Sequence, residues 1–152
     1  MMRALARVAR IRRNDDGSMA IETAFVAPIL LVLALGGFEV SSMVARQTEL
    51  QSAAAEAAAV VRATIPDTEE KRTTVRNILV TSTGLTNEQV TVTQIYRCGT
   101  ADDYVTTADS CGSQPEYKFI RVDISDTYTP VWTKFGVNSG FDFNVSRTVQ
   151  IG

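Results

Sequence analysis

The residue types that support catalysis are scarce in this chain of 152 residues. It contains no His, which excludes Ser-His-Asp and Cys-His nucleophile systems as well as His-ligated metal sites. Its two Cys are too few for a four-thiolate zinc site. Asp123 and Asp126 could in principle form an acid–base pair, but their odd spacing on a predicted strand places them on opposite faces. We therefore expect no enzyme activity, no metal and no cofactor.

The two Cys, Cys98 and Cys111, flank a polar loop. Because this loop is expected outside the cytoplasm, as argued below, the pair predicts a disulfide. A redox role would instead favour a Cys-x-x-Cys spacing. The loop also contains Asp102, Asp103 and Asp109, whose spacing fits no Ca²⁺ loop, so we interpret them as solvated acids.

The net charge of −2 is the sum of two unlike segments. Residues 1–17 carry five Arg and two Asp, a net charge of +3, whereas residues 18–152 carry a net charge of −5. The negative charge of residues 18–152 disfavours binding to the phosphate backbone of a nucleic acid, which requires clustered Lys and Arg. No nucleic-acid partner is therefore expected. The basic residues of the first segment are Arg3, Arg7, Arg10, Arg12 and Arg13.

A long apolar run follows the basic segment. Met19 to Phe38 are twenty residues interrupted only by Glu22 and Thr23, and twenty helical residues span ~30 Å, the thickness of the bilayer core. The positive-inside rule keeps the Arg cluster in the cytoplasm and places the rest outside the bacterial inner membrane. A cleaved secretory signal, a buried core helix and a plain unprocessed anchor are the alternatives.

Glu22 is an acid inside this run. A charge at the bilayer centre costs ~2.5–3.5 kcal/mol on insertion scales, which invites a functional interpretation. The alternative is simple solvation near the cytoplasmic headgroups, and position alone slightly favours it, because Glu22 is only three residues past Met19. The order of a basic head, Gly17, four residues and Glu22 at the start of an apolar helix resembles a prepilin processing site. The resemblance implies cleavage after Gly17 by a membrane peptidase. It also implies that Glu22 pairs with the new α-amino group on Ser18 of a neighbouring subunit.

A closer resemblance covers residues 17–63. Its features are Gly17, Ala20-Ile21-Glu22, Pro28, Gly37-Phe38-Glu39 and the Ala-rich continuation, with Tyr128-Thr129-Pro130 and Phe135-Gly136 in the tail. In these features the chain is similar to the TadE-like pseudopilins, or minor pilins, of tight-adherence (Tad, or Flp) pilus systems. Thr23 departs from the pattern, because this group usually carries an aromatic residue after the Glu. That departure weakens the expectation of peptidase recognition.

The resemblance implies a structural role in Tad pilus assembly, with adhesion and biofilm formation downstream. It implies as partners the lipid bilayer, a prepilin peptidase, the Flp major pilin, a TadF-like pseudopilin and the inner-membrane pilus platform. The alternative is an unprocessed single-pass protein whose periplasmic sheet or Cys loop binds a ligand.

The elements that carry these residues follow from periodicity. Helical spacing of semi-apolar residues continues past the membrane segment until Pro66, which predicts one helix over residues 18–64 with a kink at Pro28. The stripe comprises Val40, Val44, Gln47, Leu50, Ala54, Ala57, Ala58, Val61 and Ile65. It could pack against the protein's own sheet or between subunits. Residues 67–83 predict a second helix, with Asp67 or Thr68 as cap and Gly84 as stop.

Alternating apolar residues near 90–96, 120–124 and 141–151 predict an antiparallel sheet with one buried face. Trp132, Phe135, Phe141 and Phe143 are expected in the core, or alternatively in an exposed patch for a partner pilin. The fold class is therefore α+β, a long helix with a small pilin-like head. The predicted division is a cytoplasmic leader at 1–17, a transmembrane helix at 18–39, an amphipathic helix at 40–65 and a periplasmic head at 66–152.

Overall fold

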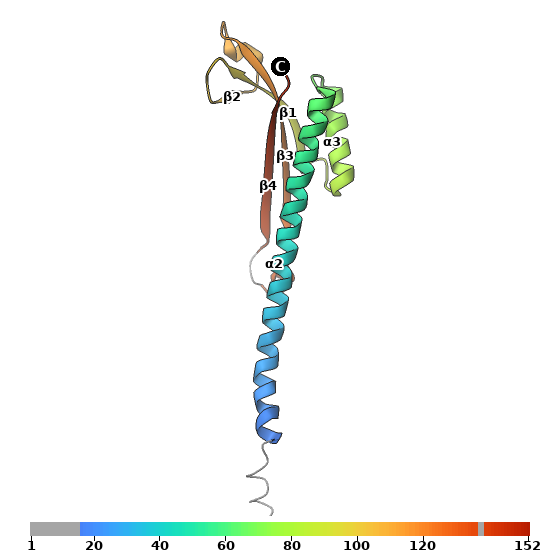
Figure 1. Cartoon of the computed structure of the whole chain (residues 1–152), viewed down its shortest axis with the longest axis vertical. Helices are drawn as coiled ribbons and strands as arrows, with labels where there is room; N and C mark the ends of the chain where they lie inside the picture. Colours follow the sequence, from blue (N-terminus) through green and yellow to red (C-terminus); the bar gives the residue numbers. More distant parts are fainter. Residues whose placement is uncertain (1–15, 137–138) are drawn as a thin grey trace, which may run out of the picture. The chain divides into compact units, whose positions relative to one another are not determined.

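The computed structural model describes residues 16–136 and 139–152. It divides into two compact units between Ser41 and Ser42, and helix α2, Asp16–Thr64, runs through both (Figure 1). The second unit, Ser42–Gly152, is called the head below. Besides the second half of α2, its described residues form helix α3, four strands and two short 3-10 helices. The predicted α+β fold is confirmed. The topology residues Arg3, Arg7, Arg10, Arg12 and Arg13 lie outside the described residues.

Helix α2 has 49 residues, a length of about 70 Å. It continues through Pro28, although proline has no N–H to donate to the carbonyl one turn back. The helix ends at Thr64, and Ile65 takes a φ of 43°, directly before the buried Pro66. The residue before a proline avoids helical angles, so the predicted stop is confirmed.

Helix α3, Glu69–Thr83, has both of its predicted ends. The Thr68 side chain accepts a hydrogen bond from the Lys71 N–H, and Gly84 closes the helix with a φ of 69°. Asp67 does not cap. It pairs instead with Lys71 at 2.8 Å, and this hydrogen bond holds the pKa of the Asp67 carboxyl below its usual value.

The sheet has the strand order β2-β1-β3-β4, with every neighbouring pair antiparallel. Its long strands are β1, Val90–Cys98, β3, Glu116–Tyr128, and β4, Phe141–Gln150. All three were predicted. The two-residue strand β2, Tyr104–Val105, and the 3-10 helix η1, Ala108–Cys111, were missed, because neither is long enough to show a period. A second 3-10 helix, η2, spans Val131–Phe135.

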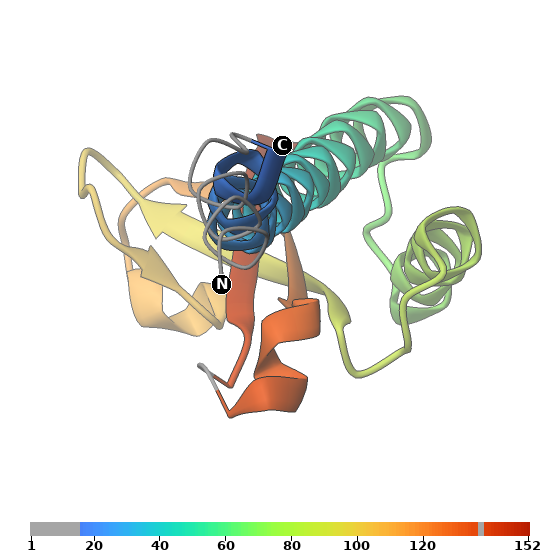
Figure 2. The same ribbon diagram turned by 90° about the horizontal axis from the view of Figure 1, so that it is seen from below.

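One face of the sheet forms the main core with the second half of α2. Leu50, Ala54 and Val61 of α2 are completely buried, and they join Val75 and Leu79 of α3 in one cluster. The sheet contributes Val90, Ile120, Val122, Ile124 and Val149 to this cluster. Both views show α2 and α3 side by side (Figures 1 and 2). The amphipathic stripe therefore packs, over residues 50–61, against the protein's own sheet.

The expectation of a single buried face was wrong at one end of the sheet. Ile95 and Phe119 are buried on the other face, where Tyr104 of the Cys98–Cys111 loop packs edge-on against the Phe119 ring. Strand β2 and η1 belong to this loop, and they lie at the opposite end of β1 from α3 (Figure 2). The disulfide fixes the loop and so creates burial that alternation alone does not predict.

Candidate functional site

The first half of α2 is apolar and exposed. This helix is long and apolar enough to cross a membrane, and none of its most hydrophobic window is buried in the described chain. Phe25, Val32 and Phe38 are each at least 71% exposed. An apolar surface of this extent is unstable in water, so the segment fits a single-pass membrane anchor.

Glu22 lies on this exposed segment. Within the described residues, no hydrogen bond or ion pair joins its carboxylate to another side chain. Next to it, the Thr23 hydroxyl donates to the Met19 carbonyl at 2.8 Å. Thr23 therefore satisfies its hydroxyl within the helix, whereas Glu22 has no such contact among the described residues.

The predicted processing position lies in the first turn of α2, where Gly17 is the second helical residue and Ser18 the third. Glycine is a poor helix former, and helix ends fray, so this turn is the part of α2 that opens most readily.

Two adjacent glycines mark the far end of the apolar segment. A Cβ added at Gly36 or Gly37 would meet nothing within 4 Å. Neither glycine is therefore required by a contact inside the described chain. Glycine on a membrane helix lets the backbone of another helix approach closely.

Residues 17–59 match the family model described as TadE-like protein. This part of the chain is TadE-like. The match begins at Gly17 and covers the exposed apolar segment together with the first buried turns of the amphipathic segment. It supports, in general terms, the role of a minor pilin associated with a Tad pilus. No curated protein and no solved structure gave a significant match.

The amphipathic stripe that follows the TadE-like apolar segment has two parts. Leu50 to Val61 contribute to the head core, whereas Val40 and Val44 are 54% and 60% exposed. Ile65, the last predicted member, is 48% exposed. Packing against the protein's own sheet is therefore confirmed for residues 50–61, and packing between subunits stays a prediction for the exposed Val40 and Val44.

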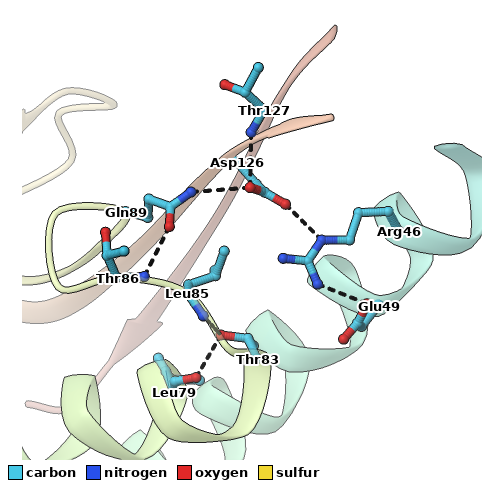
Figure 3. Close-up of polar contacts among 9 residues, drawn as sticks. All are labelled: Arg46, Glu49, Leu79, Thr83, Leu85, Thr86, Gln89, Asp126 and Thr127. Carbon is cyan, nitrogen blue, oxygen red and sulfur yellow. Dashed lines mark hydrogen bonds and ion pairs between the residues drawn. The ribbon is translucent and has the colours of Figure 1, made fainter. Parts of the chain in front are cut away.

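A polar network joins α2 to the sheet next to the lower end of the core (Figure 3). Arg46 donates to Asp126 at 2.6 Å and to Glu49 at 2.9 Å. The second Asp126 oxygen accepts from the Gln89 amide at 3.1 Å and from the Thr127 N–H at 2.9 Å. This convergence of polar groups on Asp126 was not predicted from the sequence. The register confirms that Asp123 and Asp126 lie on opposite faces of the sheet. Asp126 pairs with Phe143, whose side chain packs against the core, whereas Asp123, at odd spacing from it on β3, pairs with Thr91 on the other face.

Cys98 and Cys111 form the expected disulfide, with their Cα atoms 5.1 Å apart. Beside it, Arg97 lies over the rings of Tyr117 and Phe119, and Arg121 lies over Tyr104. The Arg121–Tyr104 contact joins the loop to the sheet, whereas the Arg97 contacts link β1 to β3. Among the described residues, no group of three or more His, Cys, Asp or Glu could hold a metal ion.

Burial at Glu39 and at the aromatic residues bears on the sequence predictions. Glu39, at the end of the apolar segment, is only 2% exposed, which sequence reasoning did not foresee. Phe143 is half-buried against the core, and Trp132 and Phe141 are also half-buried. Packing in the core is thus confirmed for Phe143, whereas the side chain of Phe135 lies outside the described residues.

Proposed function

We propose that this protein is a TadE-like minor pilin of a Tad (Flp) pilus, cut after Gly17 and acting by assembly in the inner membrane. One observation carries the proposal. The matched segment exposes an apolar run, residues 19–38, whose one carboxylate, Glu22, has no partner among the described residues. A carboxylate in the membrane needs a cationic partner, and cleavage creates one on Ser18 of a neighbouring subunit.

The topology follows from charge. The five Arg of the leader remain in the cytoplasm, residues 18–39 cross the membrane, and the head lies in the periplasm. A disulfide between Cys98 and Cys111 suits that oxidising compartment. Cleavage after Gly17 removes the leader and makes Glu22 the fifth residue of the mature chain.

The partners in this proposal are other single-helix subunits. The Flp major pilin and a TadF-like pseudopilin would pack against the exposed turn around Gly36 and Gly37 and against Val40 and Val44. The prepilin peptidase and the inner-membrane pilus platform complete the set. Adhesion and biofilm formation would follow from the assembled pilus.

Two measurements test the proposal in cells that produce the pilus components. Mass spectrometry of the purified protein should find Ser18 at the N-terminus, and affinity purification should recover the Flp pilin and the TadF-like subunit. A protein that retains Met1 and purifies without any pilus component would contradict it. That result would favour the alternative, an unprocessed membrane-anchored periplasmic binding module.

A further inference from the structure

Strand β1 has a free outer edge over most of its length. Strand β2 pairs only with Tyr96 and Arg97, and within the described chain no strand pairs with the preceding part of that edge. The Ser125 N–H donates to the Gln89 carbonyl at 2.8 Å, which fixes the alternation of the β1–β3 ladder. By that alternation, Val92 and Gln94 direct their N–H and C=O groups to the free edge, where they can bond another strand.

A groove of about 430 Å³ runs between this edge and helix α3. Its lining includes Glu69, Arg72 and Arg76 of α3, Thr93 and Tyr96 of β1, and Thr106. It is thus bounded by a helix on one side and by unpaired strand backbone on the other. Domains that bind extended peptides by strand addition use this arrangement.

The two arginines in the groove differ in what they contact. Arg72 is fully engaged, because it pairs with Glu69 at 2.8 Å and donates to Gln94 at 2.8 Å and to the Asp67 carbonyl at 3.1 Å. Arg76 has a buried Nε without a hydrogen-bond partner, and no ion pair joins it to any described residue. Glu88 acts on it only by longer-range attraction.

The other two arginines with an unpartnered Nε have a different explanation. Arg97 and Arg121 lie over aromatic rings, at 5.3 Å from Phe119 and 5.9 Å from Tyr104. Arg76 has no such ring contact in the described part of the chain. Of these three arginines, Arg76 is therefore the one whose half-buried cation would be stabilised by an anion from another molecule.

We propose that this groove binds an extended acidic segment of another polypeptide, which adds as a strand to the free edge of β1. A Glu or Asp carboxylate of that segment accepts hydrogen bonds from Arg76, and the backbone groups of Val92 and Gln94 bond the added strand. The hydroxyls of Thr93 and Thr106 offer further polar contacts at the walls. A small anion would satisfy Arg76 alone, whereas only an extended chain also uses the strand edge. The site is independent of the membrane segment and of pilus assembly.

The test uses the full chain in detergent micelles and a synthetic peptide, acetyl-Ser-Val-Thr-Glu-Thr-Val-Ser-amide, followed by NMR. The peptide should shift the amides of Val92 and Gln94 and the Nε–H of Arg76. Its Gln counterpart should bind at least about tenfold more weakly, because it lacks the charge-assisted hydrogen bond. N-acetylglutamate amide alone should leave Val92 and Gln94 unshifted.

Variants make the result specific. Arg76→Gln should weaken binding at least about tenfold, whereas Arg62→Gln, which removes an exposed charge on α2, should leave it unchanged. If Arg76→Gln perturbs the fold, Thr93→Glu places a negative charge on the same edge and should cause the same loss. Equal binding of the Gln peptide, undiminished binding by Arg76→Gln in a folded protein, or no shift at Val92 and Gln94 at millimolar peptide would overturn the proposal.

Discussion

Arg46 donates a hydrogen bond to Asp126 at 2.6 Å, which joins α2 to β3 across 80 positions of the sequence. The two side chains are 24% and 13% exposed, so solvent screens this pair only partly. Asp126 also accepts from Gln89 and Thr127, so one carboxylate connects the helix, the loop before β1 and the end of β3. The pair therefore links α2 to the end of β3.

Asp126→Ala should lower the free energy of unfolding by about 1–3 kcal/mol, because it leaves the half-buried Arg46 and the Gln89 amide without their acceptor. Denaturant unfolding in detergent would measure the change. Glu49→Gln is the matched control, since Glu49 contacts the same Arg46 but is 54% exposed, and it should alter stability by less than about 0.5 kcal/mol. Equal effects of the two changes would show that the α2–β3 link does not contribute to stability.

Leu50→Ala should destabilise the head by about 2–5 kcal/mol, because Leu50 is completely buried against the sheet. Val44→Ala, at a 60% exposed position of the same helix, should change stability by less than about 0.5 kcal/mol. It should instead reduce recovery of pilus partners. A loss of stability in Val44→Ala would show that the lower part of the stripe also packs on the head.

Glu22→Ala should leave membrane insertion intact and lower recovery of partner subunits at least about tenfold, because the charge-assisted contact with a neighbouring Ser18 amine is lost. Quantitative mass spectrometry of affinity-purified complexes would measure the recovery. Glu56→Ala, which removes an exposed acid from the head end of α2, is the control and should have no effect. Normal pilus formation by Glu22→Ala would remove the role assigned to this acid.

Gly37→Leu should block close approach of a neighbouring helix and reduce assembly, while the chain by itself remains as stable as before. No atom lies within 4 Å of a Cβ at this position, so a larger side chain fits without strain in the described chain. Chemical crosslinking in membranes would report assembly, and denaturant unfolding would report stability. If assembly persists in the Gly37→Leu variant, the helices must meet through another face.

Replacing both Cys98 and Cys111 by Ser should lower stability by about 3 kcal/mol, because the disulfide closes a loop with a sequence separation of 13. A reductant should lower the stability of the native protein by the same amount and leave the double variant unchanged. Stability that does not respond to reductant would show that the contacts of Tyr104 with Arg121 and Phe119 hold the loop unaided.

The sequence predicted the regular elements well. The stop at Pro66, the caps of the second helix and the three long strands all depend on residues that act within a few positions of themselves, and all three features are present. The disulfide was also foreseen, although from the expected compartment rather than from geometry. The fold class therefore followed from local chemistry and periodicity.

What the sequence did not show depends on contacts between distant elements. The network around Asp126 joins residues from α2, from the loop before β1 and from β3, so no local sequence pattern predicts it. The burial of Ile95 and Phe119 requires the loop to fold back over the second face of the sheet, which alternation on β1 and β3 cannot indicate. The helical spacing of Val40 and Val44 predicted their face of the helix, but only packing distinguishes these exposed residues from the buried Leu50.

The sharing of α2 between the two units has a consequence for proteolytic release. The helix supplies Leu50, Ala53, Ala54, Ala57 and Val61 to the head core. A protease that cut α2 just after Ser41 would therefore shed a head that keeps its whole core, including the helical residues that cover the sheet. A cut between Leu50 and Val61 would instead remove part of that cover and expose the apolar face of the sheet, so the released fragment would aggregate.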